Sequence, residues 1–134
     1  MLLVDSNIFL ELFLGRKRSD ECEGLLNRIA EGEVEAVVTR FTVHSIEAIL
    51  NEPELVLNFL RNVMNSIGLQ VYDASLDDEV AAAMLMADVK LDFDDAIQYY
   101  VAKKVGVSAI VSFDKHFDKL YISRKEPKDL LKAA

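Results

Sequence analysis

Residues 1–15, MLLVDSNIFLELFLG, decide the fold that the sequence predicts. Leu2 to Val4 is a short apolar run, typical of a strand that is buried on both faces, and it stops at Asp5. Beyond Asp5, apolar residues recur at helical spacing until Gly15. A buried strand that leads through an acid into a helix is a typical opening unit of an α/β fold. A secretory signal is a poorer interpretation, because the stretch lacks a basic start and contains acids.

The same alternation of strands and helices continues along the chain. Apolar runs bounded by turn residues predict further strands at residues 34–39, 69–72 and 107–112, and a weak one at 121–123. Helical periodicity predicts helices at residues 19–31, 42–50, 52–67, 75–89 and 94–105, and after Pro127. We therefore expect an α/β fold with a mainly parallel sheet and helices on both faces.

Residues at the helix starts carry their own expectations. Asp20 and Glu23 have the spacing of a capping box, and so do Ser75 and Asp78. Thr42 is placed to cap the helix that follows it. The residues predicted to face the core from the second, third and fourth helices are Cys22, Leu25, Leu26 and Ile29, then Val43, Ile46, Ile49 and Leu50, then Leu55, Phe59, Leu60, Val63 and Ile67.

The helix predicted from Pro53 to Ile67 is apolar on more than one face. Leu55, Val56, Leu57, Phe59 and Leu60 leave it little polar surface. Two interpretations stay open: the helix packs fully within the monomer, or part of it forms a surface for a second copy or a partner protein.

The composition fits one domain, residues 1–134, in a reducing compartment. The chain is 51% apolar, which is ample for one buried core. Cys22 is the only cysteine, so no internal disulfide can form, and its spacing from His44 and His116 resembles no Cys/His metal site. No segment approaches the roughly 18 uncharged apolar residues that a membrane span needs. We expect a cytoplasmic protein without a membrane association.

The net charge of −8 is unfavourable for binding a polyanion, because Lys and Arg supply the phosphate contacts. The basic residues are concentrated in two places, however. Arg16-Lys17-Arg18 follows the first predicted helix, and residues 115–134 hold six basic and three acidic residues. These segments are either phosphate-facing patches or ordinary solvated surface charge.

Acids from four separate segments are directed to one edge of the predicted sheet. Asp5 directly follows the first strand, and Asp114 follows the 107–112 strand with one residue between. Asp94 and Asp95 begin a helix, and Glu47 lies one turn into another. A helix packed antiparallel to its strand begins at the carboxyl end of that strand, which is where parallel sheets bind ligands.

Each acid also has a simpler explanation. Asp5 could cap the first helix, Asp94 or Asp95 could favour the helix dipole, and Asp114 could be a turn residue. Glu47 is harder to explain in this way, because it lies near an apolar stripe where an ionised side chain needs a partner. The convergence of the acids favours a shared site more than any single acid does.

Carboxylates gathered in one cleft repel one another unless a cation lies between them. Oxygen-rich sites of this kind suit Mg²⁺ or Mn²⁺. The predicted chemistry is metal-assisted attack of water on a phosphodiester.

Four short motifs resemble the PIN-domain family, and in particular its VapC-type toxins, over essentially the whole chain. They are V-D-S-N at 4–7, T-V-H-S-I-E ending at Glu47, L-D-F-D-D-A-I at 91–97 and S-F-D-K-H-F at 112–117. The resemblance implies a PIN-like three-layer sandwich with a mainly parallel five-stranded sheet. It also implies a Mg²⁺- or Mn²⁺-dependent ribonuclease that acts on single-stranded RNA, a frequent homodimer, and a cognate antitoxin protein as partner.

The resemblance also implies roles for single residues. The family acid before the alanine maps onto Asp95, which leaves Asp94 as an auxiliary residue. Ser112 keeps the hydroxyl of a usual threonine, and Ser6 or Asn7 matches a small polar position that orients Asp5 or a metal-bound water.

Our mechanistic hypothesis divides the acids by role. Asp5, Asp95 and Asp114 ligate one metal directly or through water, and Glu47 binds a second metal or accepts a proton.

Three other functions compete with this hypothesis. A phosphatase of the haloacid-dehalogenase type needs a second acid two residues after the first, where this chain has Asn7. A response-regulator receiver would use Asp73 after the third strand, but it needs an acid pair and a lysine that are not evident here. The third is a catalytically silent PIN fold that serves only as a binding or scaffold protein.

Overall fold

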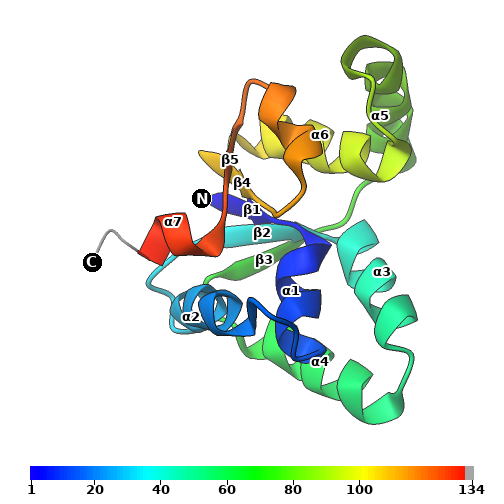
Figure 1. Cartoon of the computed structure of the whole chain (residues 1–134). Helices are drawn as coiled ribbons and strands as arrows, with labels where there is room; N and C mark the ends of the chain where they lie inside the picture. The colour runs from blue at the N-terminus through cyan, green and yellow to red at the C-terminus, as the bar shows by residue number, and fades with distance from the viewer. Residues whose placement is uncertain (132–134) are drawn as a thin grey trace.

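The computed structural model describes residues 1–131, and its centre is a five-stranded sheet in which every neighbouring pair is parallel (Figure 1). The strand order is β3-β2-β1-β4-β5. The strands are β1 Leu2–Val4, β2 Ala36–Thr39, β3 Leu69–Tyr72, β4 Ala109–Val111 and β5 Ser123–Lys125. The expectation of a mainly parallel five-stranded sheet is therefore confirmed.

Helices cover both faces of the sheet and make three layers (Figure 1). One face carries α1 Ser6–Phe13, α2 Ser19–Ala30, α3 Arg40–Leu50, α4 Pro53–Asn65 and α7 Pro127–Leu131. The other carries α5 Leu76–Val89, α6 Phe93–Val105 and the short 3-10 helix η1 Lys115–Lys119. Successive strand residues point to opposite faces, so each face has its own core.

The alternation is visible in the central strands. Val4 and Val111 belong to the core beneath the first group of helices, while Leu3 and Ile110 belong to the core beneath α5 and α6. All four side chains are buried. Both faces of the inner strands are covered, which explains why their sequences are apolar without polar alternation.

The helix starts differ from two of the predictions. Thr39, and not Thr42, caps α3: its side-chain oxygen accepts a hydrogen bond of 3.0 Å from the Thr42 amide. The predicted capping box at Asp20 and Glu23 is wrong. The N-cap residue of α2 is Arg18, and no side chain makes a capping hydrogen bond there. The box formed by Ser75 and Asp78 at the start of α5 is confirmed.

The predicted core-facing residues are confirmed for α2 and corrected for α3 and α4. Ile49 is 54% exposed, because it lies at the edge of the stripe formed by Thr42, Val43, Ile46 and Leu50. Ile67 is 80% exposed, because α4 ends at Asn65 and the chain has already turned toward β3. Of the α4 residues, Phe59 is fully buried and Leu57 is about half exposed, so this helix is not packed entirely within the monomer.

Three of the strands begin or end elsewhere than predicted. β2 starts at Ala36, β4 is confined to three residues, and β5 begins two residues later than the predicted strand. β5 reads Ser-Arg-Lys and lies at the edge of the sheet, so it lacks the apolar pattern that marks a buried strand. No helix within residues 1–131 has the length and apolar character required to cross a membrane.

Candidate metal centre at the carboxyl edge of the sheet

The ends of β1 and β4 lie at the point where the order in which the chain adds strands to the sheet reverses. The chain builds β1, β2 and β3 outward on one side and then returns to add β4 on the other side of β1. Open parallel sheets bind ligands at this kind of switch point. The Asp5 amide donates a 3.0 Å hydrogen bond to the carbonyl of Val111, which fixes the two strand ends together.

Asp5 is the buried hub of the site. Its Oδ1 accepts hydrogen bonds from the Ser6 amide (2.8 Å) and from Gln98 Nε2 (3.3 Å). Its Oδ2 accepts from Ser112 Oγ (2.7 Å) and Asn7 Nδ2 (3.3 Å). A carboxylate has about four lone-pair positions, so all of them are engaged. The bond from Ser6 also makes Asp5 the cap of α1, so the capping role and the site role coexist.

Ser112 and Asn7 hold the strand ends in register with Asp5. Ser112 is fully buried, and its hydroxyl oxygen accepts from Asn7 Nδ2 (3.2 Å) and from the Asp114 amide (2.9 Å). Asn7 Oδ1 accepts from the Phe113 amide (3.3 Å). One hydroxyl therefore links Asp5 to the turn that carries Asp114.

Asp95, Asp114 and His116 form a compact group beside Asp5. One ligand atom from each of the three lies within 4.8 Å of the others. His116 Nδ1 is 3.1 Å from Asp114 Oδ1 and 3.5 Å from Asp95 Oδ2. Asp114 also caps η1 by accepting a 2.9 Å hydrogen bond from the His116 amide.

The acids at this edge repel one another. Burial raises the pKa of Asp95 to about 6, and repulsion from Asp114, Asp94 and Asp5 adds to the rise, while the His116 contact opposes it. Burial also raises the pKa of Asp5 above its ordinary value, against the hydrogen bonds from Ser112, Ser6 and Gln98 and with a contribution from Asp114. Raised pKa values on two neighbouring acids indicate a place where added positive charge would be favourable.

The donor set fits a divalent cation. Within residues 1–131, the ion pairs formed by Asp5, Asp95 and Asp114 involve only His116 and no Lys or Arg. The adjoining hollow, between α1, α3 and α6, has a volume of about 30 Å³, which exceeds the roughly 10–15 Å³ that a single water molecule needs. Carboxylate oxygens around so small a space suit Mg²⁺ or Mn²⁺.

The other predicted site residues lie at the rim or apart. Asp94 is exposed and lines the small hollow together with Asp5, Ser6 and Asp95. Glu47 is partly buried on α3, and its carboxylate contacts His44 Nδ1 at 2.9 Å. The acids thus form a central group of Asp5, Asp95 and Asp114, with Glu47 held in a separate pair.

Sequence reasoning missed Gln98, which connects three elements. Gln98 is 3% exposed; its amide nitrogen donates to Asp5, and its oxygen accepts a 3.0 Å hydrogen bond from Thr39 Oγ1. The signal in the sequence was a polar residue between Ile97 and Tyr99, one turn after Asp95. Such a residue on a buried stripe needs a polar partner.

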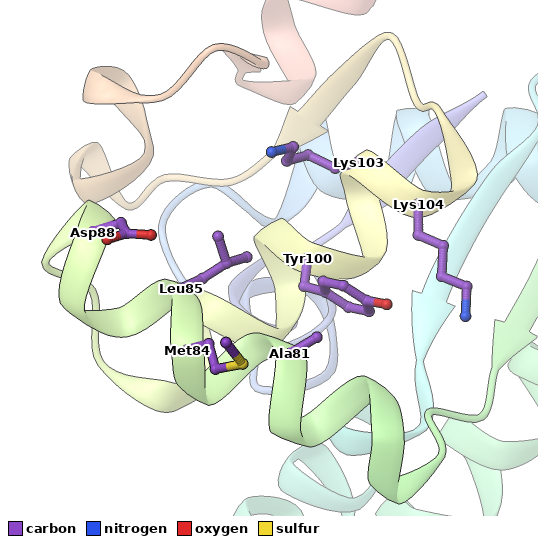
Figure 2. A pocket seen from close by; sticks show the side chains of 7 residues that line it. All are labelled: Ala81, Met84, Leu85, Asp88, Tyr100, Lys103 and Lys104. Atoms are coloured by element: carbon purple, nitrogen blue, oxygen red, sulfur yellow. The ribbon is translucent and has the colours of Figure 1, made fainter.

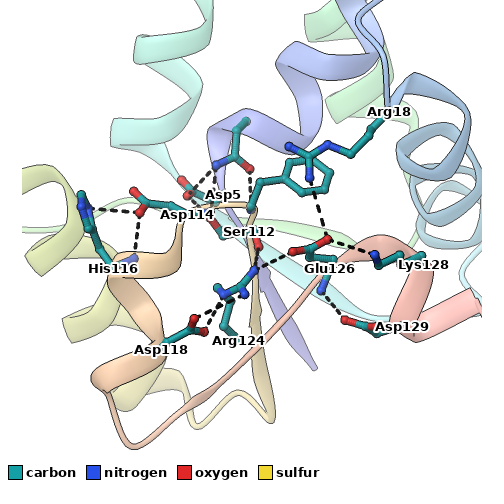
Figure 3. A network of polar contacts seen from close by, with 12 residues as sticks. Asp5, Arg18, Ser112, Asp114, His116, Asp118, Arg124, Glu126, Lys128 and Asp129 are labelled. Carbon is teal, nitrogen blue, oxygen red and sulfur yellow. Dashed lines mark hydrogen bonds and ion pairs between the residues drawn. The ribbon is translucent and has the colours of Figure 1, made fainter.

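Much of the basic charge near the C-terminus is already engaged (Figure 3). Arg124 pairs with Asp118 (2.6 Å) and Glu126 (3.0 Å) and donates to the carbonyl of Ser112 (3.0 Å). Arg124 therefore supports the turn behind the acids, and it is not a free phosphate ligand. Of the six basic residues noted in the sequence, Lys132 lies outside the described residues.

The Arg16-Lys17-Arg18 run contacts the same turn through Arg18. Arg18 stacks over the ring of Phe113, with its guanidinium carbon 3.6 Å from the ring centroid, and pairs with Glu126 at 3.8 Å. Arg16 and Lys17 are exposed. Arg18 therefore lies beside the turn that carries Asp114, and its charge is already engaged.

Larger hollows exist away from the acids. The cavity in Figure 2 has a volume of about 560 Å³ and lies between α5 and α6, where Met84, Leu85 and Tyr100 line it. Its lining is mostly apolar and includes none of the converging acids. Asp5 and Asp95 therefore line the small polar hollow and not this apolar cavity.

Comparisons with known proteins agree with this geometry. The family model described as PIN domain matches residues 2–122. Among solved structures, VapC20 of Mycobacterium tuberculosis, described as a Sarcin-Ricin loop cleaving toxin, has a TM-score of 0.77 at 17% identity, over 95% of this chain and 100% of that one. A toxin–antitoxin complex from Klebsiella pneumoniae gives 0.74 at 18% identity, over 95% and 98%. No curated protein matches this chain. At such identities the structural likeness shows the fold.

Proposed function

The chain belongs to the PIN-domain family, and we propose that it is a metal-dependent endoribonuclease that hydrolyses phosphodiester bonds of single-stranded RNA. We further propose that it is the toxin of a toxin–antitoxin pair and acts in the cytoplasm. The observation that carries the proposal is the convergence of Asp5, Asp95 and Asp114 on one switch point without a Lys or Arg ion pair among residues 1–131. The two solved structures named above support it by analogy of fold.

The surroundings of the acids favour different roles for them. Asp95 and Asp114 have open carboxylate positions and would ligate the cation directly, with His116 beside them. Asp5 already accepts four hydrogen bonds, which favours a role in fixing the geometry of the site over direct ligation of the cation. When bound, a divalent cation supplies Lewis-acid activation of water and neutralises charge on the phosphate.

The protein groups then position the reaction. Water attacks phosphorus, the bond to the leaving oxygen breaks, and that oxygen takes up a proton. We propose that Glu47, whose carboxylate contacts His44, accepts a proton or ligates a second cation. Hydrogen bonds from Ser112 and the Ser6 amide oppose the rise in the pKa of Asp5 that burial causes, and together with Asn7 they orient its carboxylate.

The test uses Asp95→Asn, which removes one charge and keeps the shape. Wild type is expected to bind Mn²⁺ and Mg²⁺ by calorimetry and to cut a single-stranded RNA oligonucleotide, and the variant is expected to do neither. Asp88→Asn is the matched control, because Asp88 is exposed near the end of α5 and belongs to no acid group. If wild type binds neither ion and cuts no RNA, the silent binding protein becomes the better explanation. Asp5→Asn is likewise expected to abolish cleavage without unfolding the chain.

Two exposed apolar surfaces supply candidate partner sites. On α4, Leu57 and Met64 are exposed, and we assign this surface to a cognate antitoxin. On α5, Leu76, Val80 and Met84 form an exposed stripe at four-residue spacing. We propose that this stripe packs against the same stripe of a second copy across a two-fold axis.

A further inference from the structure

A second hollow lies next to the acid centre and shares one wall with it. Phe41, in the first turn of α3, lines both the small hollow beside Asp5 and a neighbouring one of about 180 Å³. The neighbouring hollow is lined chiefly by Arg40, Phe41, His44, Asp73, Glu79 and Ile97. Its volume is below the roughly 300–1,000 Å³ of pockets for drug-sized ligands, so it suits one ring system.

The shared wall is an exposed aromatic ring. Phe41 is 40% exposed, and its ring meets that of Phe93 edge to face, with centroids 6.2 Å apart and the planes at 71°. Phe93 directly precedes Asp94 and Asp95, so the pair of rings stands at the rim of the acid centre. An aromatic ring held in this way offers an apolar face on which a flat molecule can stack.

The polar groups of the hollow select the kind of molecule. Asp73 and Glu79 place two carboxylates in the lining, and these would repel a phosphate. They would accept hydrogen bonds from N–H donors of a neutral ring. Arg40 and His44 add donors at the same hollow, and Ile97 adds an apolar surface. A nucleobase combines a flat apolar face with such an edge of donors and acceptors.

We propose that this hollow binds one unstacked base of the RNA, close to the phosphodiester that is cut. Phe41 is the stacking surface, and Asp73 and Glu79 favour a base with an exocyclic amino group over uracil. The inference rests on the proposed ribonuclease function and adds a base preference to it. It also gives a physical reason for a single-stranded substrate, since a base inside a duplex is stacked and paired and cannot enter.

The first experiment measures the base preference. Wild type with Mn²⁺ is incubated with single-stranded RNA of randomised sequence, and the cut ends are sequenced. We expect uracil to be depleted at one fixed position relative to the cut, and we expect the Asp73→Asn/Glu79→Gln double variant to lose that depletion. Cleavage by wild type with no base preference at any position would overturn the inference while leaving the ribonuclease function intact.

The second experiment tests the stacking surface with kcat and KM on a defined oligonucleotide. Phe41→Leu keeps an apolar side chain but removes the ring, and it is expected to raise KM about tenfold or more, with a smaller effect on kcat. Phe41→Tyr should restore the wild-type KM. Tyr121→Leu is the matched control, because Tyr121 is 99% exposed just before β5, and the parallel strands begin at the edge opposite the acids.

A substrate with one abasic nucleotide shows whether the effect of Phe41→Leu comes from lost stacking or from a general loss of folding. Removing the base at the selected position should raise the KM of wild type by the same factor as Phe41→Leu does. The two changes together should raise KM no further. Independent, multiplying losses would contradict the inference. An absence of any cleavage by wild type would instead overturn the proposed function, and this inference with it.

Discussion

Replacement of Asp95 by Asn is expected to stabilise the metal-free protein at neutral pH. The pKa of Asp95 is raised to about 6, so the ionised carboxylate is less favourable in the folded state than in the unfolded chain. Two pKa units correspond to about 3 kcal/mol at most, and because the side chain is partly open to solvent we expect about 1–2 kcal/mol. The sign follows from the raised pKa: the penalty is full above about pH 6 and fades as the pH falls toward 4.

A divalent cation should reverse the order of the two proteins. An ion that binds only the folded state stabilises it by about 2.7 kcal/mol at 100 times its dissociation constant. Wild type should gain this stabilisation, whereas Asp95→Asn should gain little because one ligand has lost its charge. The variant is therefore the more stable protein in EDTA and the less stable one in excess Mn²⁺.

The assay is urea unfolding at pH 7.5 and pH 4.0, with EDTA, and at pH 7.5 with Mn²⁺. Asp88→Asn, which replaces an exposed acid outside the acid centre, serves as the control and should show neither the pH-dependent gain nor the reversal. If Asp95→Asn destabilises the protein equally in EDTA and in Mn²⁺, the acids do not repel one another in the folded state, and the reasoning is refuted.

Three further results are expected. Ser112→Ala should lower the free energy of unfolding by about 1–3 kcal/mol and reduce RNA cleavage, because Asp5, Asn7 and the Asp114 amide each lose a hydrogen-bond partner. Ser112→Thr keeps the hydroxyl and should retain most of the stability and most of the cleavage. Urea unfolding and cleavage assays check both variants, and unchanged stability of Ser112→Ala would contradict this role. Lys104 holds the pKa of Asp78 well below its usual range. The ion pair therefore stabilises the fold at any pH above the pKa of an unfolded-state aspartate. This stabilisation is lost as the pH falls through the lower pKa that Asp78 has in the folded state. Lys104→Met should accordingly be less stable than wild type at pH 7, with a difference that shrinks in strong acid; a difference independent of pH in urea titrations would argue against the ion pair. Wild type should sediment as a dimer and Met84→Glu as a monomer, with Met64→Glu on α4 as the control that stays dimeric; a dimer that survives Met84→Glu would exclude the α5 stripe.

The sequence was sufficient for those features that depend on local patterns. Cys22, Leu25, Leu26 and Ile29 repeat at helical spacing, and all four are buried as predicted. Asp5 follows a strand that is apolar throughout, so its place at the carboxyl edge could be inferred before the strand order was known.

Features that depend on long-range contacts could not be predicted in this way. The role of Gln98 rests on Asp5, which is 93 residues away, and on Thr39, which is 59 residues away. The edge strand β5 is held by pairing with β4 and has no apolar pattern of its own. The carboxylate of Glu47 is paired with His44 on the same helix. Its convergence with the other acids therefore remains a prediction.

The first two turns of α6 determine how far the acid centre and the base hollow lie from each other. Asp95 belongs to the acid group, Ile97 lines the base hollow, and Gln98 donates to Asp5. These side chains leave one rigid helix within four residues, and Thr39 and Thr42 anchor Gln98 to the start of α3, which also carries Phe41. A base on Phe41 and a phosphate at Asp95 would therefore be held at a fixed separation. Gln98→Leu removes this link without changing any acid, so it should make the position of the cut relative to the selected base more variable, with a smaller effect on the rate of cleavage. Sequencing of the cut ends should show a broader distribution of cut positions. An unchanged distribution would mean that packing alone holds α3 and α6 in position.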